Sequence, residues 1–180
     1  MSGSVIQQLL VPAGLVEADL EQTLALTMGR GVDYADLYFQ QSRQESWSLE
    51  DGIIKDGGYH LEQGVGVRAC SGEKTGFAYS DDLILPALQD AAKAARAISR
   101  QGADAKVQAW KRPAVTNYYA DSNPISSLSV EQKLALLQQA DATARAEDPR
   151  VTQVNVSLAG GVDTVLVAAS DGTFATDVRP

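Results

Sequence analysis

The chain has 180 residues, of which 44% are hydrophobic and 21% charged, an ordinary composition for a globular protein. Its formal charge of −8 argues against a nucleic-acid partner, which would require a basic face. No stretch approaches the ~20 apolar residues that span a bilayer, so no membrane partner is expected. A single cysteine, Cys70, cannot form an internal disulfide, and no Lys or Arg precedes Arg30 as a secretory signal would require. The expected compartment is the cytoplasm.

The first 80 residues predict a helix followed by an antiparallel meander. Leu20, Leu24 and Met28 recur every four residues and line one face of a helix over 16–29. From residue 34 the period changes to two, which is typical of strands with one covered face. Strands are predicted at 34–40, 46–50, 65–70 and 75–79, with turn signals at Asp51-Gly52, Asp56-Gly57-Gly58 and Ser71-Gly72-Glu73-Lys74. Trp47 and Phe77 lie on the apolar phases of their strands, so both are predicted to be largely buried.

A second helix is predicted over 83–100, with an apolar stripe at Ile84, Leu88, Ala91, Ala95 and Ile98. The basic residues Lys93, Arg96 and Arg100 are interpreted as solvated side chains that complement the helix dipole, with an anion site as the less favoured alternative. Residues 101–128 lose all periodicity and are predicted to be a linker.

Ser129 and Gln132 form a capping box that opens a third helix, ended by Pro149. The apolar stripe of this helix is predicted at Val130, Leu134, Leu137, Ala140 and Ala144. Strands at 154–158, 162–169 and 174–178 are predicted to follow it.

The predicted fold class is α+β: a helix, antiparallel β-meander and helix unit, followed by a helix plus antiparallel strands. The predicted domains are residues 1–100, a linker at 101–128, and the start of a second α+β unit at 129–180. The last strand still alternates where the chain ends. We therefore expect the second unit to be incomplete.

The side chains that perform chemistry are scarce in this chain. A zinc site needs three or four ligands, but His60 and Cys70 are the only histidine and cysteine, so no zinc is expected to bind within residues 1–180. Residues 64–69 satisfy the pattern G-x-G-x-x-A, yet they alternate within a predicted strand and do not open a helix, which disfavours dinucleotide binding. No catalytic residue can be assigned.

Four segments together resemble the N-terminal region of TldD-type members of the TldD/PmbA family, once described as modulators of DNA gyrase. The segments are LYFQ (37–40), SWSLEDGIIKDGGY (46–59), QGVGVRA (63–69) and SGEKTGFAYSD (71–81). The resemblance implies a cytoplasmic zinc metallopeptidase that cleaves short or unfolded peptides and takes part in peptide maturation. It also implies a heterodimer with a PmbA/TldE-like paralogue. The family signature H-E-x-x-x-H is absent here and is expected beyond residue 180, so no metal or catalytic residue of the family transfers to this chain. The resemblance therefore implies that the chain is truncated before the catalytic domain.

Within the full-length protein we expect this region to serve as scaffold, assembly surface or substrate-admission wall. The candidates for substrate contact are Arg68, Gly64, Gly66 and Tyr59, because the Gly-rich strand allows close backbone approach and Arg68 could meet a carboxylate. The plainer interpretation is that the glycines relieve packing and that Arg68 pairs with a neighbouring acid. The alternative function is a stand-alone module that binds extended peptides or other proteins through strand edges or through Trp47, Tyr59 and Tyr79.

Overall fold

The computed structural model describes residues 2–29, 31–98, 106–112, 118–119 and 123–180. Arg100 and residues 101–105, 113–117 and 120–122 of the predicted linker lie outside these ranges. The elements in chain order are α1 (Ser2–Leu9), α2 (Glu17–Thr27), β1 (Tyr34–Glu50), β2 (Ile53–Ser71), β3 (Lys74–Ser80), α3 (Leu85–Ile98), α4 (Val130–Glu147), β4 (Asn155–Ala169) and β5 (Phe174–Arg179). The strands form one antiparallel sheet in the order β3-β2-β1-β4-β5. The α+β class is therefore confirmed.

The molecule divides into two compact units, each of which is built from three separate segments of the chain. Unit 1 comprises Met1–Gln41, Glu62–Tyr118 and Thr164–Val178; unit 2 comprises Ser42–Leu61, Tyr119–Asp163 and Arg179–Pro180. The strands β1, β2 and β4 contain 17, 19 and 15 residues and contribute to both units. A division along the strands differs from the sequential boundaries 1–100, 101–128 and 129–180, which remain a prediction about domains.

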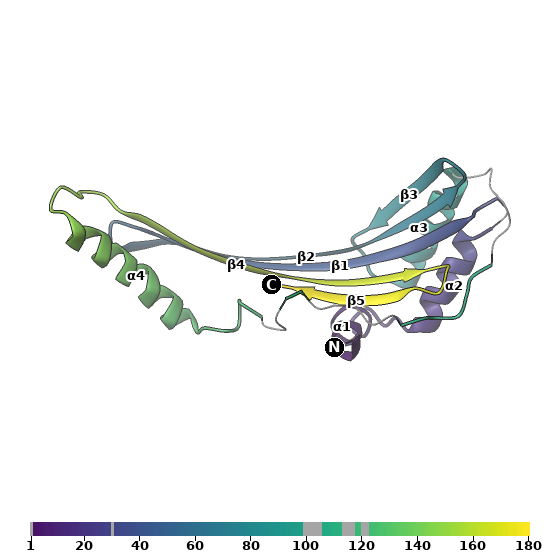
Figure 1. The fold of residues 1–180 in the computed structure, drawn as a ribbon, viewed down its shortest axis with the longest axis horizontal. Helices are drawn as coiled ribbons and strands as arrows, with labels where there is room; N and C mark the ends of the chain where they lie inside the picture. Colours follow the sequence, from purple (N-terminus) through teal and green to yellow (C-terminus); the bar gives the residue numbers. More distant parts are fainter. Residues whose placement is uncertain (1, 30, 99–105, 113–117, 120–122) are drawn as a thin grey trace. The chain divides into compact units, whose positions relative to one another are not determined.

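Unit 1 contains the large apolar core. The inward residues of β1 and β2 alternate as predicted, and all six are at most 1% exposed: Ala35, Leu37, Phe39, Val65, Val67 and Ala69. Helices α2 and α3 pack against each other, and α3 also contacts β3 (Figure 1). The predicted stripe of α2 is confirmed, as are Leu88, Ala91 and Ala95 of α3. The prediction is wrong for Ile84, which precedes α3 and is 49% exposed. The sequence reading missed α1, although it buries Val5 and Leu9, four residues apart.

Unit 2 is thinner, with α4 lying along its strands (Figure 1). The predicted capping box is confirmed: Ser129 N–H donates to Gln132 Oε1 at 2.9 Å, and Gln132 N–H donates to Ser129 Oγ at 3.3 Å. Of the predicted apolar stripe, Leu137 is buried and Leu134 and Ala144 are half-buried, whereas the prediction is wrong for Val130 and Ala140, which are exposed. The buried residues of α4 are Lys133, Leu137 and Asp141, so two of the three are charged.

Three predicted breaks in the strands are wrong. Strand β1 is continuous from Tyr34 to Glu50, and β4 is continuous from Asn155 to Ala169. Asp56-Gly57-Gly58 lies inside β2 instead of forming a turn. The reason at Gly57 is a close approach, because a Cβ there would lie 2.5 Å from the Trp47 ring. The turns at Asp51-Gly52 and at Gly72-Glu73 are confirmed.

The predicted burial of Phe77 is also wrong. Its side chain is 58% exposed and Tyr79 is 78% exposed, whereas Gly76 is buried and Ala78 packs against the core. Small residues therefore occupy the inner face of β3, beneath α3, and the aromatic residues occupy the outer face. Trp47 is half-buried.

Candidate functional site

Arg68, predicted to contact substrate, lies on β2 with its side chain 49% exposed. Its Nε donates to Asp36 Oδ2 at 2.7 Å, and its guanidinium lies 5.8 Å from the centre of the Tyr34 ring. The hydrogen bond to Asp36 raises the pKa of Arg68 above its ordinary value. The plainer interpretation, pairing with a neighbouring acid, therefore describes what Arg68 does within this chain. A contact with substrate stays a prediction.

The other three candidates have different surroundings. A Cβ at Gly66 would lie 2.9 Å from the Phe77 ring, and one at Gly64 would lie 3.1 Å from the Ser80 carbonyl oxygen. The space beside both glycines is therefore occupied by the chain's own β3 residues. Tyr59 is 56% exposed and belongs to unit 2, whereas the other candidates belong to unit 1. The structure brings Arg68, Gly64 and Gly66 to one strand segment and leaves Tyr59 apart from them.

Strand β2 has an open edge in unit 2. Its pairing with β3 runs from Ser71 back only to Val65, and β1 is its other neighbour. Within the described ranges, residues 53–61 have no strand on the side away from β1. Most side chains of this segment are exposed. An open edge presents main-chain N–H and C=O groups that an extended peptide can pair with.

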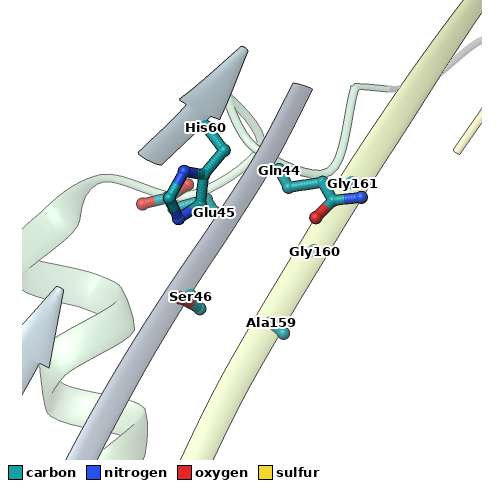
Figure 2. A pocket seen from close by; sticks show the side chains of 7 residues that line it. All are labelled: Gln44, Glu45, Ser46, His60, Ala159, Gly160 and Gly161. Carbon is teal, nitrogen blue, oxygen red and sulfur yellow. The ribbon is translucent and has the colours of Figure 1, made fainter. Parts of the chain in front are cut away.

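A hollow of about 350 Å³ lies in unit 2, and we call it the His60 hollow (Figure 2). It is lined by residues of β1, β2 and β4: Gln44, Glu45, Ser46, His60, Ala159, Gly160 and Gly161. A Cβ at Gly58 would lie 3.2 Å from Ser46 Oγ and 3.7 Å from His60 Nε2. The missing side chain of Gly58 therefore keeps the space between these two polar groups open.

A second hollow of about 210 Å³, the Trp47 hollow, shares Glu45, Ala159 and Gly160 with the first. Its other lining residues are mostly apolar: Trp47, Pro124, Ile125, Ser127, Leu128, Lys133 and Leu158. Along β1, Gln44 and Ser46 alternate with Glu45 and Trp47, and alternate residues of a strand point to opposite faces. The two hollows therefore differ in both chemistry and orientation.

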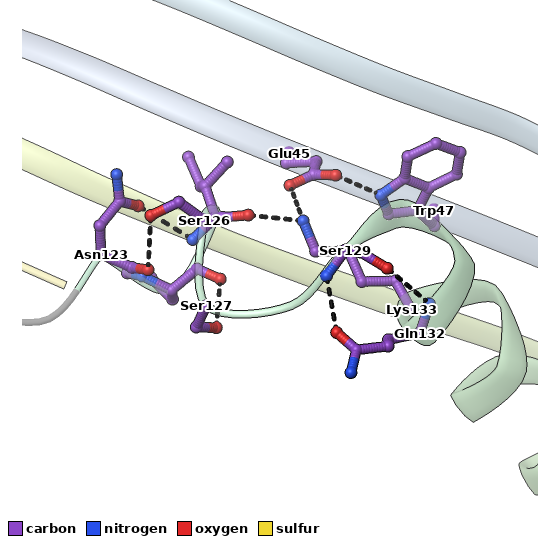
Figure 3. Close-up of polar contacts among 10 residues, drawn as sticks. Glu45, Trp47, Asn123, Ser126, Ser127, Ser129, Gln132 and Lys133 are labelled. Atoms are coloured by element: carbon purple, nitrogen blue, oxygen red, sulfur yellow. Dashed lines mark hydrogen bonds and ion pairs between the residues drawn. The ribbon is translucent and has the colours of Figure 1, made fainter.

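A nearly buried ion pair forms one wall of the Trp47 hollow (Figure 3). Lys133 Nζ donates to Glu45 Oε2 and to the Ile125 carbonyl oxygen, each at 2.6 Å, and Trp47 Nε1 donates to Glu45 Oε1 at 2.5 Å. The Lys133 and Glu45 side chains are only 8% and 11% exposed. The hydrogen bond from Lys133 holds the pKa of the Glu45 carboxyl below its ordinary value of 4.5, although burial acts in the opposite direction.

The described residues do not include a group of side chains that could bind a metal ion. No three His, Cys, Asp or Glu side chains come together there in a way that could hold a metal ion. His60 lines the polar hollow of unit 2, whereas Cys70 belongs to unit 1, where its Sγ lies 3.9 Å from Thr75 Oγ1. The residues present therefore do not fit the zinc site that the resemblance implies for the full-length protein.

Among the helices in the described ranges, none is long and apolar enough to cross a membrane.

Several residues of these sites were missed by the sequence reading. Nothing in a single sequence pairs Glu45 with Lys133, because the contact joins positions 88 residues apart. The adjacent glycines Gly160 and Gly161 did offer a signal, since glycine within a strand often marks a close backbone approach. A Cβ at Gly161 would lie 3.3 Å from the Arg43 carbonyl oxygen.

Two sequence models of one protein family match the chain. Residues 35–99 match PmbA/TldA metallopeptidase domain 1, and residues 123–180 match the PmbA/TldA metallopeptidase central domain.

Two curated proteins are similar over nearly the whole chain. A Haemophilus influenzae protein named metalloprotease TldD homolog is 48% identical, over 100% of this chain and 38% of that protein. A metalloprotease TldD homolog of Buchnera aphidicola subsp. Schizaphis graminum is 40% identical, over 98% of this chain and 36% of that protein. The chain therefore spans little more than a third of the length of these relatives.

Solved structures share the fold at low sequence identity. A Thermotoga maritima protein described as a modulator of DNA gyrase has a TM-score of 0.69 at 19% identity, covering 91% of this chain and 37% of that chain. TldE from Thermococcus kodakarensis has a TM-score of 0.61 at 18% identity, covering 88% of this chain and 37% of that chain. At such identities the likeness concerns the fold alone.

Proposed function

We propose that this chain is a non-catalytic region that admits extended peptides to the peptidase centre of a larger protein. The chain belongs to the PmbA/TldD metallopeptidase family, as an N-terminal part of a TldD-like protein. Two observations support a non-catalytic role. The relatives named metalloproteases are more than twice as long as the chain. The described residues also lack a set of side chains that could hold a metal. The catalytic groups accordingly lie in another part of the whole protein.

The open edge of β2 carries the proposal of peptide admission. A peptidase that acts on short or unfolded chains has to recognise peptides of many sequences. Main-chain pairing at a strand edge selects for an extended conformation and not for particular side chains. The segment 53–61 provides such an edge and is exposed along most of its length. Edges of this kind are normally protected in proteins, so an open one calls for a partner strand.

Three further assignments belong to the same proposal. The metal of the whole protein is zinc, the partner is a PmbA/TldE-like paralogue in a heterodimer, and the compartment is the cytoplasm. The fold shared with TldE from Thermococcus kodakarensis supports the choice of a TldE-like partner. The charge of −8 is in keeping with the absence of nucleic acid from this list of partners.

Amide hydrogen exchange in the whole parent protein tests the role of the edge. The parent is first depleted of metal with a chelator so that bound peptide is not cleaved. Exchange is then measured with and without a short synthetic peptide of alternating Thr and Ala, called here the Thr–Ala peptide. We expect slower exchange at alternate amides of residues 53–61, because a new strand would occupy the outward-facing N–H groups.

The β3 segment 74–80 provides the control for this experiment, because it is the other described strand at that side of the sheet. Protection confined to 53–61 supports admission at this edge. Peptide binding that leaves exchange at 53–61 unchanged would show that this edge is not where peptides enter.

A further inference from the structure

We propose that the His60 hollow binds an amide group of a peptide; the peptide as its source rests on the proposed function. The hollow lies on the strands behind the open edge, since His60 belongs to β2 and its other lining residues belong to β1 and β4. Its volume of about 350 Å³ falls at the lower end of the range for small-ligand pockets, roughly 300–1,000 Å³.

The hydrogen-bonding chemistry of the hollow matches an amide. Gln44 and Ser46 can each donate one hydrogen bond and accept another, and His60 offers two ring nitrogens for hydrogen bonding. None of the three side chains has a hydrogen-bond partner within the part of the chain that the structure describes. A peptide amide also offers one donor and one acceptor, so it can pair with these groups without bringing a charge into the hollow.

The electrostatics of the hollow disfavour a charged ligand. Glu45 is the one acidic lining residue, and its carboxylate is held by Lys133 at 2.6 Å and by Trp47 at 2.5 Å. No Lys or Arg lines the hollow. An anion would therefore meet no unpaired cation there, and a cation would meet no unpaired carboxylate. An uncharged polar group is the ligand that remains.

The glycines around the hollow allow close approach. Gly58 leaves the space between Ser46 and His60 open, and Gly160 and Gly161 expose main chain along β4. A side chain at position 58 would come within 3.2 Å of Ser46 Oγ. The hollow is thus lined by polar side chains of β1 and β2 and by the small residues Ala159, Gly160 and Gly161 of β4.

Binding of the Thr–Ala peptide to the metal-depleted parent protein, followed by fluorescence anisotropy, tests this assignment. Gln44→Met, Ser46→Ala and His60→Phe each remove hydrogen-bonding groups while keeping a similar or smaller shape. All three residues are exposed, so their variants are expected to fold, which circular dichroism verifies. Each should raise Kd by about 2- to 10-fold, the effect of one lost hydrogen bond. Ser48→Ala is the matched control, on the same face of β1 but outside the hollow, and should leave Kd unchanged.

Two altered peptides distinguish the sources of the amide. If a main-chain amide enters the hollow, an N-methylated Thr–Ala peptide should bind more weakly and lose its dependence on Gln44. If a side-chain amide enters, replacing one Thr by Gln should tighten binding to the unaltered protein but not to Gln44→Met. Either result supports the assignment.

Unchanged Kd in all three hollow variants, with every peptide, would overturn it. If residues 53–61 are still protected from exchange in that case, the proposed admission of peptides stands and only the hollow is wrongly assigned. If protection is also missing, both proposals fall.

Discussion

Glu45 and Lys133 illustrate how much of this structure depends on individual polar residues. Both lie in unit 2, and both are nearly removed from water. A charge in such a place is stable only when its partner and its remaining hydrogen bonds are in position, and here Trp47 and the Ile125 carbonyl oxygen complete the arrangement. The pair fastens the first turns of α4 to β1.

Removing one partner of this pair should be costly. Lys133→Met leaves the Glu45 carboxylate without its cation, and we expect a loss of about 3 kcal/mol in the free energy of unfolding measured with urea. The double variant Glu45→Gln with Lys133→Met removes both charges and should recover most of that loss. A single variant as stable as the parent would show that the pair is not formed as described.

The pair also predicts a response to acid. Because the pKa of Glu45 is lowered in the folded state, its contribution to stability is complete above the ordinary value of 4.5 and is lost as the pH falls through the lower, folded-state value. Urea unfolding between pH 7 and pH 3 should therefore show a smaller acid-induced loss in Glu45→Gln than in the parent. Glu62→Gln, at an exposed position of β2, is the control and should leave the slope unaltered.

Phe39 and Phe77 form a second matched test at single residues. Phe39 is fully buried, so Phe39→Ala should cost about 3–5 kcal/mol, whereas Phe77 is 58% exposed, so Phe77→Ala should cost about 1 kcal/mol or less. Denaturant unfolding measures both. Equal losses would mean that the outer face of β3 is covered.

At the scale of single elements, α4 shows why the sequence predicted some helices better than others. The helix and its capping box follow from local signals, Ser129 and Gln132 above all. Which face it turns inward does not, because Lys133 pairs with Glu45 of β1, and Asp141 pairs with Arg145 of the same helix, whose guanidinium also binds Asp51. In α2, by contrast, apolar spacing alone identified Leu20 and Leu24, since that helix packs on a large apolar core.

The strands follow the same division. Alternation located the buried positions of β1 and β2 in unit 1, where one face meets the core. It could not reveal that Gly57 makes room for the Trp47 ring and does not form a turn, because Trp47 lies on the neighbouring strand. The phase of β3 was misread because Phe77 and Tyr79 suggest an inner face, whereas the small residues Gly76 and Ala78 occupy the face toward the core. The residues of the two hollows were likewise hidden, since they come together only through strand pairing.

The packing face of α4 can be tested with two neighbouring leucines. Leu137 is 2% exposed and Leu136 is 46% exposed. Leu137→Ala should lower the free energy of unfolding by about 2–4 kcal/mol, and Leu136→Ala by about 0.5 kcal/mol. The reverse order would place the opposite face of the helix against the strands.

At the scale of the whole molecule, function follows from what the described residues contain and what they lack. They provide a core in unit 1, and an open strand edge and two hollows in unit 2. They do not provide a set of ligands for a metal. The proposed function assigns recognition to this region and hydrolysis to another part of a protein that, like the relatives named metalloproteases, is more than twice this length.

Metal content and peptidase activity measured side by side in residues 1–180 and in the whole parent protein test this division most directly. Both proteins are dialysed, their zinc is measured by mass spectrometry, and hydrolysis of a labelled unfolded peptide is followed with and without a chelator. We expect zinc and chelator-sensitive hydrolysis in the parent, and neither in residues 1–180 once circular dichroism shows that this chain is folded. Stoichiometric zinc or chelator-sensitive hydrolysis by residues 1–180 alone would contradict the account.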